Sequence, residues 1–155
     1  MKRLIILDLD NTLIYGTYEI GLSAKILLRY SNSILIYERP YAREFIQKCH
    51  EVGDVIIVTT AIKDYAESII KALNIKCFEL YSREDCLIQN DYYMKCAPDF
   101  YFDLYDEIII VDDSPEIWDK ESQVSCKFII PTKFFGDGED TGLEFSKQEL
   151  IKIAE

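Results

Sequence analysis

The sequence predicts an α/β fold in which helices cover both faces of a parallel sheet. Strand-like and helix-like segments alternate along the chain, which is typical of a βαβ arrangement. Several strand segments are unbroken apolar runs, as in strands that are buried on both faces. The chain has 155 residues, 49% of them hydrophobic, which is enough for one core but leaves little room for a second domain. We therefore expect a single Rossmann-like domain over residues 1–155.

Hydrophobic spacing places the strands. The first strand is expected at residues 4–7, a run of four apolar side chains. The segment 24–40 contains two β-rich runs around Ser31–Ser33, which predicts a hairpin inserted after the first strand. Four further strands of the central sheet are expected within 54–61, 75–82, 107–115 and 126–131.

Terminal residues place the helices. Pro40 suits the first turn of a helix that ends at Gly53. Asp64 is expected to cap the next helix, and Asn74 to end it. The tetrad Ser146–Glu149 has the pattern of a capping box, which predicts a short final helix that opens there.

Composition narrows the functional classes. The formal net charge is −11 and no block of Lys and Arg is present, so a long nucleic acid is not an expected partner. The five cysteines are odd in number and form no C-x-x-C pair, which disfavours a disulfide framework or a zinc ribbon. His50, the one histidine, is expected at the surface. No stretch has the length of a membrane span and the N-terminal apolar run is too short for a signal peptide. We therefore expect a protein without a membrane partner, located in the cytoplasm or, if the source is a eukaryote, in the nucleus.

Polar side chains end three of the predicted parallel strands. Asp8 and Asp10 follow the first strand, Thr60 comes just after the apolar run within 54–61, and Asp112 comes just after the apolar run within 107–115. The carboxyl ends of parallel strands meet at one edge of the sheet, where ligands bind. Carboxylates at two strand ends are ligands suited to Mg²⁺, with Asp8 and Asp112 as the natural pair. The cation would also explain how two neighbouring acids are tolerated beside a core.

The same constellation suits phosphate-ester chemistry. A carboxylate can accept a phosphoryl group and so divide hydrolysis into two steps, a role that fits Asp8. A second acid can protonate the leaving oxygen and then activate water, which fits Asp10 two residues later. Thr60 and the backbone amides that follow it are expected to hold phosphate oxygens. A lysine would complete the charge balance.

The motif "DLDNTL" around these aspartates resembles the D-x-D-x-T signature of the haloacid dehalogenase (HAD) superfamily. Further segments resemble, in order, those of the phosphatases that act on the C-terminal domain (CTD) of RNA polymerase II, including the small CTD phosphatases and the Dullard-type, NLI-interacting-factor-like enzymes. These segments are "ERPYAREFI", "IVTTAIKDYA", "YSREDCLIQNDYYMK", "IIIVDDSPE" and "FFGDGEDTGL". Together they cover almost the whole chain, so the resemblance implies a HAD-like fold and phosphatase activity.

The resemblance also implies roles for individual residues. Asp8 is the expected nucleophile and a Mg²⁺ ligand. Asp10 is the expected acid/base, and its backbone carbonyl a second ligand. Thr60 and Lys95 are expected to hold the transferring phosphate. Asp112 is the remaining ligand.

Four other residues belong to the segments that carry the resemblance. Thr12 is expected to support the nucleophile loop, and Arg83 matches an arginine near the family's substrate groove. Two positions depart from the family pattern, which has Glu where Asn11 stands and Asn where Asp113 stands. Asp113 is either a site residue or the cap of a short helix at Ser114, and the cap is at least as plausible an interpretation.

The segment between residues 13 and 40 is too short for a lid domain, so we expect an open site without a large cap. An open site admits a protein loop, which favours phosphoserine or phosphothreonine in a protein or peptide as the substrate of a monomeric enzyme. Two alternatives remain: the same chemistry on a small phosphorylated metabolite or nucleotide, or a non-catalytic module that binds phosphate. Cys77 and Arg83 also form C-x₅-R, the spacing of cysteine-dependent phosphatases, although the segment between them lacks glycine and predicts a strand.

Overall fold

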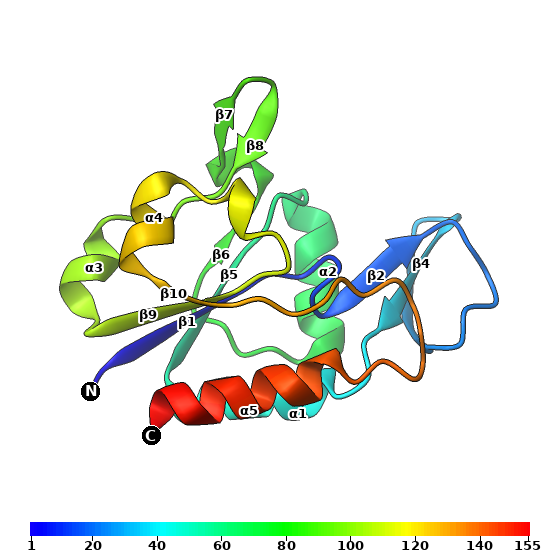
Figure 1. Ribbon diagram of the computed structural model, residues 1–155. Helices are drawn as coiled ribbons and strands as arrows, with labels where there is room; N and C mark the ends of the chain where they lie inside the picture. Colours follow the sequence, from blue (N-terminus) through cyan, green and yellow to red (C-terminus); the bar gives the residue numbers. More distant parts are fainter.

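The computed structural model describes residues 1–155, and its centre is a five-stranded sheet in the order β10-β9-β1-β5-β6 (Figure 1). Every neighbouring pair in this sheet is parallel, as the apolar runs predict. The strands are β1 (Arg3–Leu7), β5 (Asp54–Val58), β6 (Leu80–Tyr81), β9 (Glu107–Val111) and β10 (Lys127–Ile129).

Helices cover both faces of this sheet, and alternate residues of β1 face the two layers. Ile5 and Leu7 belong to the larger core cluster, which lies under α1 (Ala42–Val52), α2 (Lys63–Leu73) and α5 (Gly142–Ala154). Leu4 and Ile6 belong to a second cluster, on the side of α3 (Phe100–Leu104) and α4 (Lys120–Ser125). The fold is therefore the predicted α/β arrangement. None of these helices is long and apolar enough to cross a bilayer.

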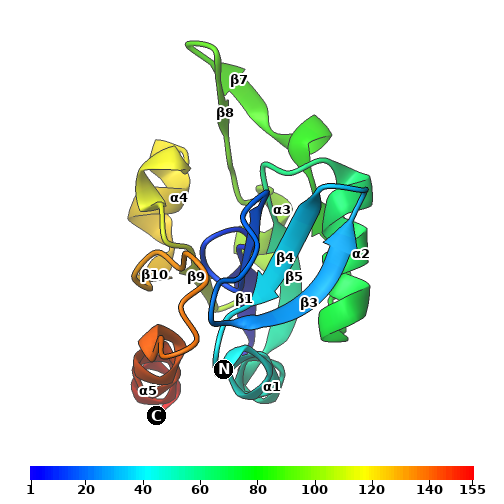
Figure 2. The ribbon, with the colours of Figure 1, turned by 90° about the vertical axis from the view of Figure 1, so that its right-hand side faces the viewer.

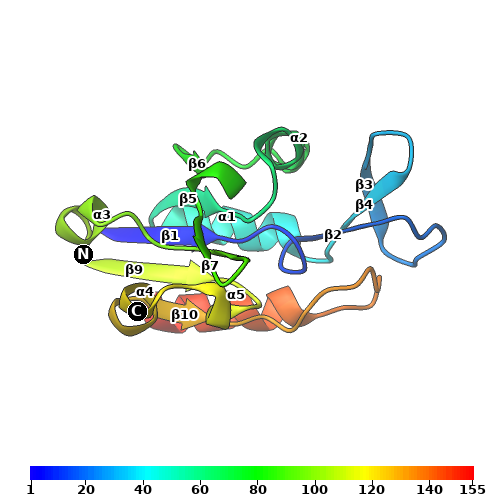
Figure 3. The same ribbon diagram turned by 90° about the horizontal axis from the view of Figure 1, so that it is seen from above.

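A small antiparallel sheet lies beyond the carboxyl ends of the parallel strands (Figures 1 and 3). Its order is β2-β4-β3, with β2 at Ile14–Thr17, β3 at Lys25–Tyr30 and β4 at Ile34–Glu38. The predicted hairpin is confirmed as β3 and β4, and β2 is a further strand that the sequence analysis did not anticipate. No large cap is present. A second unpredicted hairpin, β7 (Leu87–Gln89) and β8 (Tyr92–Met94), projects away from the central sheet (Figure 2).

Three predicted helix starts are wrong. The first helix begins at Ala42 after Tyr41, whose φ is 68°, so Pro40 precedes the helix. Asp64 does not cap α2, because the helix already begins at Lys63. The Asp64 carboxylate instead accepts a hydrogen bond from the Tyr30 hydroxyl (2.9 Å).

The capping box at 146–149 is also wrong. The last helix begins at Gly142, and the Ser146 hydroxyl donates to the Gly142 carbonyl one turn earlier (3.1 Å), as serine does inside a helix.

Other terminal residues behave as predicted. Gly53 and Asn74 follow the last residues of α1 and α2, and Asn74 adopts the left-handed conformation (φ 56°). The strand expected over 75–82 shrinks to the two residues of β6. His50 is partly exposed, as expected of a residue at the surface, and its Nε2 accepts a hydrogen bond from the Lys76 amide (3.4 Å).

Candidate active site

The register of the central sheet brings the predicted site residues to one edge. Leu7 pairs with Ile57 on one side and with Val111 on the other. The Asp8 amide continues the ladder by donating to the Val111 carbonyl (3.0 Å). The residues that follow β1, β5 and β9 therefore lie side by side, as parallel topology requires.

Lys95 joins two of these strand ends in a buried cluster. Its Nζ donates to Asp8 Oδ1 (2.9 Å) and to Asp112 Oδ2 (2.7 Å). Only 1% of the Lys95 residue is exposed, so both contacts lie away from bulk water. We call these three residues the Lys95 centre. One cation between two carboxylates leaves this centre with a net negative charge when both acids are ionised.

Neighbouring donors hold the two carboxylates of the Lys95 centre in place. The Thr12 hydroxyl donates to Asp8 Oδ2 (2.7 Å), which is the supporting position expected of Thr12. Asp112 accepts from Trp118 Nε1 (2.9 Å) at Oδ2 and from the Ser114 amide (2.9 Å) at Oδ1. Every oxygen of both carboxylates thus has a donor, and the geometry is fixed before any ligand enters.

The carboxylate of Asp10 stands apart from the Lys95 centre. It accepts a hydrogen bond from the Tyr65 hydroxyl (2.8 Å), which α2 supplies. A Cβ at Gly16 would overlap this hydroxyl, so glycine there leaves the space that Tyr65 occupies. Burial raises the pKa of Asp10, and the hydrogen bond from Tyr65 opposes that shift. A raised pKa suits a group that must both donate and accept a proton near neutral pH.

Asp113 does not cap the short helix η2 (Pro115–Ile117), so that interpretation is wrong. Its carboxylate instead accepts from Lys133 Nζ (2.6 Å) and the Ser114 hydroxyl (3.0 Å), and it shares the single proton of the Thr12 hydroxyl (2.9 Å) with Asp8. Burial alone would raise the pKa of Asp113, but hydrogen bonding with Asp8 and then with Lys133, Thr12 and Ser114 outweighs burial and lowers this pKa to about 2. Asp113 therefore stays ionised beside the Lys95 centre.

Asn11 lies in the turn that directly follows Asp10, the second catalytic candidate of the "DLDNTL" motif. Its φ is 65°, a conformation that asparagine adopts more readily than most residues. Its side-chain Nδ2 donates to the Phe134 carbonyl (2.9 Å), and the Phe134 amide donates back to the Asn11 carbonyl (2.9 Å). These two bonds attach the turn to the late "FFGDGEDTGL" segment.

Thr60 and Arg83 lie together on the β5 side of the edge. Thr60 is half-buried, and its hydroxyl forms no hydrogen bond within the chain. Its carbonyl accepts from Arg83 Nε (2.9 Å), so the predicted substrate arginine touches the predicted phosphate-binding loop. The amide of Ala61, however, donates to the Thr59 hydroxyl (3.1 Å), so the first amide after Thr60 is already paired.

A second buried cluster was not predicted from the sequence. Arg39 is fully buried and pairs with both carboxylate oxygens of Asp140, at 2.7 and 3.2 Å. It also donates to the Thr12 carbonyl (3.0 Å) and to the Thr132 hydroxyl (3.1 Å). We call Arg39 and Asp140 the Arg39 pair. The pair links the segment before α1 to the segment before α5 and supports the backbone of the Asp8 loop.

The donors at this edge suit a hard divalent cation. Carboxylate oxygens of Asp8, Asp112 and Asp113 lie within 4.8 Å of one another. Burial raises the pKa of Asp8 well above its ordinary value, while Lys95 opposes the shift and Asp112 adds to it. A second cation would favour the ionised form of Asp8 that a nucleophile requires. An all-oxygen donor set is the kind that Mg²⁺ prefers.

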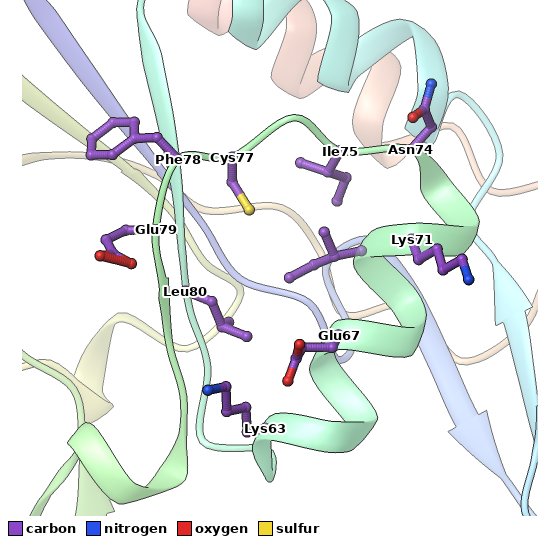
Figure 4. Close-up of a pocket in the computed structure, with 10 residues that line it drawn as sticks. Lys63, Glu67, Lys71, Asn74, Ile75, Cys77, Phe78, Glu79 and Leu80 are labelled. Atoms are coloured by element: carbon purple, nitrogen blue, oxygen red, sulfur yellow. The ribbon is translucent and has the colours of Figure 1, made fainter.

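The alternative based on Cys77 and Arg83 is not assembled. The Phe78 amide pairs with Val55 at the start of β5, whereas Arg83 contacts Thr60 beyond its end. Figure 4 shows Cys77 in a pocket of about 410 Å³ between α2 and the segment that leads into β6. Burial raises the pKa of the Cys77 thiol, which disfavours the reactive thiolate.

Four residues of this region were missed from sequence: Arg39, Tyr65, Trp118 and Lys133. Arg39 and Tyr65 lie inside segments that carry the family resemblance, so the motifs were the available signal. Trp118 and Lys133 had no such signal, because their contacts with Asp112 and Asp113 depend on how η2 and the segment after β10 fold back.

A parallel sheet with acidic residues and a lysine at its carboxyl edge, a small inserted sheet and no large cap define a HAD-type phosphatase fold. Residues 3–155 match the family model described as NLI interacting factor-like phosphatase. The chain therefore belongs to the NLI-interacting-factor-like phosphatase family, as the motifs indicated.

Individual relatives agree with this assignment. Phosphatase Herzog of Drosophila melanogaster is 26% identical over 99% of this chain and 44% of its own length. The human CTD small phosphatase-like protein is 24% identical over 92% of this chain and 52% of its own length. The chain thus spans about half the length of these curated relatives.

Solved structures support the fold. The fission yeast RNA polymerase II CTD phosphatase Fcp1, as an R271A variant bound to beryllium fluoride, superposes with a TM-score of 0.61. The sequence identity is 18%, and the match covers 99% of this chain and 50% of that one. This likeness concerns the fold alone.

Proposed function

We propose that this chain is a magnesium-dependent phosphomonoester hydrolase that acts through an aspartyl-phosphate on phosphoserine or phosphothreonine in a protein or peptide. The observation that carries the proposal is the Lys95 centre, in which Lys95 joins Asp8 and Asp112 at the carboxyl edge of the sheet (2.9 and 2.7 Å). A phosphoryl group has negative oxygens, and a buried lysine beside a carboxylate nucleophile offers both attraction and a reactive oxygen.

The reaction divides into two displacements. In the first, an Asp8 carboxylate oxygen bonds to phosphorus while the bond from phosphorus to the ester oxygen breaks, and Asp10 gives that oxygen a proton. In the second, Asp10 takes a proton from water, the water oxygen bonds to phosphorus, and the bond to Asp8 breaks to release inorganic phosphate. Lys95 and the free hydroxyl of Thr60 hold the phosphoryl oxygens through both steps.

Asp8, Asp112 and the backbone carbonyl of Asp10 are the groups that we propose hold Mg²⁺, with Asp113 close to them. When bound, the ion supplies positive charge that offsets the charge of the phosphoryl oxygens. The other two supports belong to the chain: Thr12 fixes the orientation of Asp8, and Tyr65 fixes that of Asp10.

A protein substrate is favoured by the open edge, since the small inserted sheet is no lid domain. The names of relatives described as CTD phosphatases agree with a phosphorylated protein as substrate. Hydrolysis of a small phosphorylated metabolite by the same residues is the second candidate, because the phosphate-binding groups would serve either ester. We also propose that residues 1–155 act as one monomeric domain in the cytoplasm.

The direct test is hydrolysis of p-nitrophenyl phosphate by the wild type and by Asp8→Asn, with Mg²⁺ and with EDTA. We expect the wild type to be active only with Mg²⁺ and Asp8→Asn to lose at least about 10³-fold in kcat, because the amide cannot accept the phosphoryl group. Cys77→Ser is the matched control and should keep wild-type activity. Activity that survives in Asp8→Asn and disappears in Cys77→Ser would reject the proposal.

A further inference from the structure

The β7–β8 hairpin presents apolar side chains to solvent. Ile88 and Tyr92 are 73% and 76% exposed, and Leu87 is 52% exposed. The strands are only three residues long and pair with each other alone, so no core holds these side chains. An exposed apolar patch of this kind on a projecting element indicates an interaction surface.

One side of the hairpin forms a groove with η2. The groove has a volume of about 340 Å³ and is lined mainly by Tyr92, Tyr93, Met94 and Ile117, with Glu116 as its one charged residue. Ile88 does not line it, although it pairs directly with Tyr93 across the hairpin. The groove therefore uses one part of the apolar surface and leaves Ile88 outside.

The groove adjoins the Lys95 centre through both of its walls. Met94 directly precedes Lys95, and Ile117 directly precedes Trp118, which binds Asp112. The two walls are joined by a hydrogen bond from the Lys95 amide to the Ile117 carbonyl (2.9 Å). The residues that line the groove are thus joined directly to the backbone that positions Lys95.

Arg83 makes a second connection to the site. Its guanidinium lies over the Tyr93 ring, 5.0 Å from the centroid, while its Nε donates to the Thr60 carbonyl. A peptide that leaves the phosphate site along this side would therefore pass Arg83 and reach the groove.

We infer that this groove binds an apolar side chain of the substrate peptide, near the phosphorylated residue. The inference rests on the proposed function, because it supplies a determinant for the same site. A second copy of the chain is a poor occupant, since two three-residue strands cannot bury the ~800 Å² per partner that a stable interface needs. Glu116 at the groove disfavours acidic neighbours of that apolar residue.

The test compares Tyr92→Ser with Ile88→Ser, a control of equal exposure on the same hairpin that lies outside the groove. Substrates are phosphoserine peptides in which one leucine or phenylalanine is moved through the positions around the phosphoserine, with alanine versions as references. We expect the wild type to favour the apolar peptide at one position. Tyr92→Ser should lose that preference by about tenfold in kcat/KM, mainly through KM, as expected for one buried apolar side chain. Ile88→Ser should keep it.

Hydrolysis of p-nitrophenyl phosphate, measured in parallel, separates the two proposals, because that substrate has no peptide. Equal losses in the two variants, or no preference for an apolar position in the wild type, would overturn the inference and leave the proposed chemistry standing. Turnover of p-nitrophenyl phosphate without turnover of any phosphopeptide would overturn it as well.

Discussion

The Arg39 pair and the Lys95 centre both contact the Asp8 loop, and they differ in the balance of positive and negative charge. In the Arg39 pair one guanidinium meets one carboxylate, and its other donors meet a carbonyl and a hydroxyl. In the Lys95 centre one ammonium meets two carboxylates, and a third carboxylate, Asp113, lies beside them. Both clusters are built from segments far apart in the sequence.

The difference separates a structural ion pair from a reactive one. Arg39 has its charge matched and sits over the Phe134 ring, so nothing in that cluster calls for a further ion. A Cβ at Gly142 would overlap its guanidinium, which shows how closely the chain is packed around it. When both of its acids are ionised, the Lys95 centre has excess negative charge at an edge that ligands can reach. Excess charge held in place by the fold is characteristic of sites that bind metal and substrate.

The largest effect is expected for Lys95→Met. Removing the buried cation takes away an attraction for the phosphoryl oxygens that strengthens as their charge develops, so kcat should fall by at least about 10³-fold. Steady-state hydrolysis of p-nitrophenyl phosphate measures this loss, and circular dichroism checks that the variant is folded. A kcat within tenfold of wild type would place Lys95 in the structural class with Arg39.

Arg39→Met should act in the opposite way, on stability rather than on turnover. It leaves the carboxylate of Asp140 without its buried partner, so the free energy of unfolding should fall by about 3–5 kcal/mol. Urea denaturation provides the measurement, and kcat per folded molecule should stay within about tenfold of wild type. A loss of stability below about 1 kcal/mol would contradict a structural role.

Tyr65→Phe is expected to have an intermediate effect. It removes the hydroxyl that orients Asp10 at 2.8 Å but keeps the ring that packs edge-on against Tyr30. We expect kcat to fall by about tenfold, with little change in stability, because general acid–base catalysis depends on the position of the acid. Gly16→Ala should lower kcat in the same direction by displacing the Tyr65 hydroxyl. Unchanged kcat in both variants would remove Asp10 from its assigned role.

The smallest effect concerns a partly exposed cluster at the other end of the sheet. Glu107 binds Arg3 (3.0 Å) and Lys127 (2.7 Å). Burial would raise the pKa of Glu107, but these two partners outweigh burial and lower it. The carboxylate therefore stabilises the fold above its unfolded pKa near 4.3, and this stability is lost as the pH falls through the lower folded value.

Thermal unfolding of the wild type and of Glu107→Gln, measured between about pH 6 and pH 3, tests this pH dependence, because the glutamine cannot titrate. Over that range the free energy of unfolding should fall further in the wild type than in the variant. We expect this extra loss to be under about 1 kcal/mol, because solvent partly screens the partners of Glu107. A stability difference that does not change with pH would show that the Glu107 carboxylate contributes nothing.

Much of the fold could be predicted because its strands are unbroken apolar runs. These runs located β1, β5 and β9, and the parallel topology then placed Asp8, Thr60 and Asp112 at one edge. Helix starts were less predictable, since Ser146 has a capping pattern but donates to a carbonyl inside a helix that had already begun. The β6 strand was overestimated because an apolar run alone does not fix how many of its residues pair with β5.

The site shows a similar division. Carboxylates and Lys95 could be nominated from motif and position, whereas the side chains that hold them could not. Trp118 reaches Asp112 only because the chain after η2 pairs with the backbone of Lys95. This contact joins segments that are distant in the sequence, so no local sequence pattern predicts it. Asp113 looked like a helix cap in the sequence, but Lys133, twenty residues later, takes its carboxylate.

We propose that the Lys95 centre carries out the covalent step on Asp8. Rapid quenching of the wild-type protein in acid during turnover, followed by mass spectrometry of its peptides, tests this most directly. We expect one added phosphoryl group on the peptide that contains Asp8, and none in Asp8→Asn. Turnover with no phosphorylated peptide under any quench time, or with the phosphoryl group on a peptide that lacks Asp8, would contradict it.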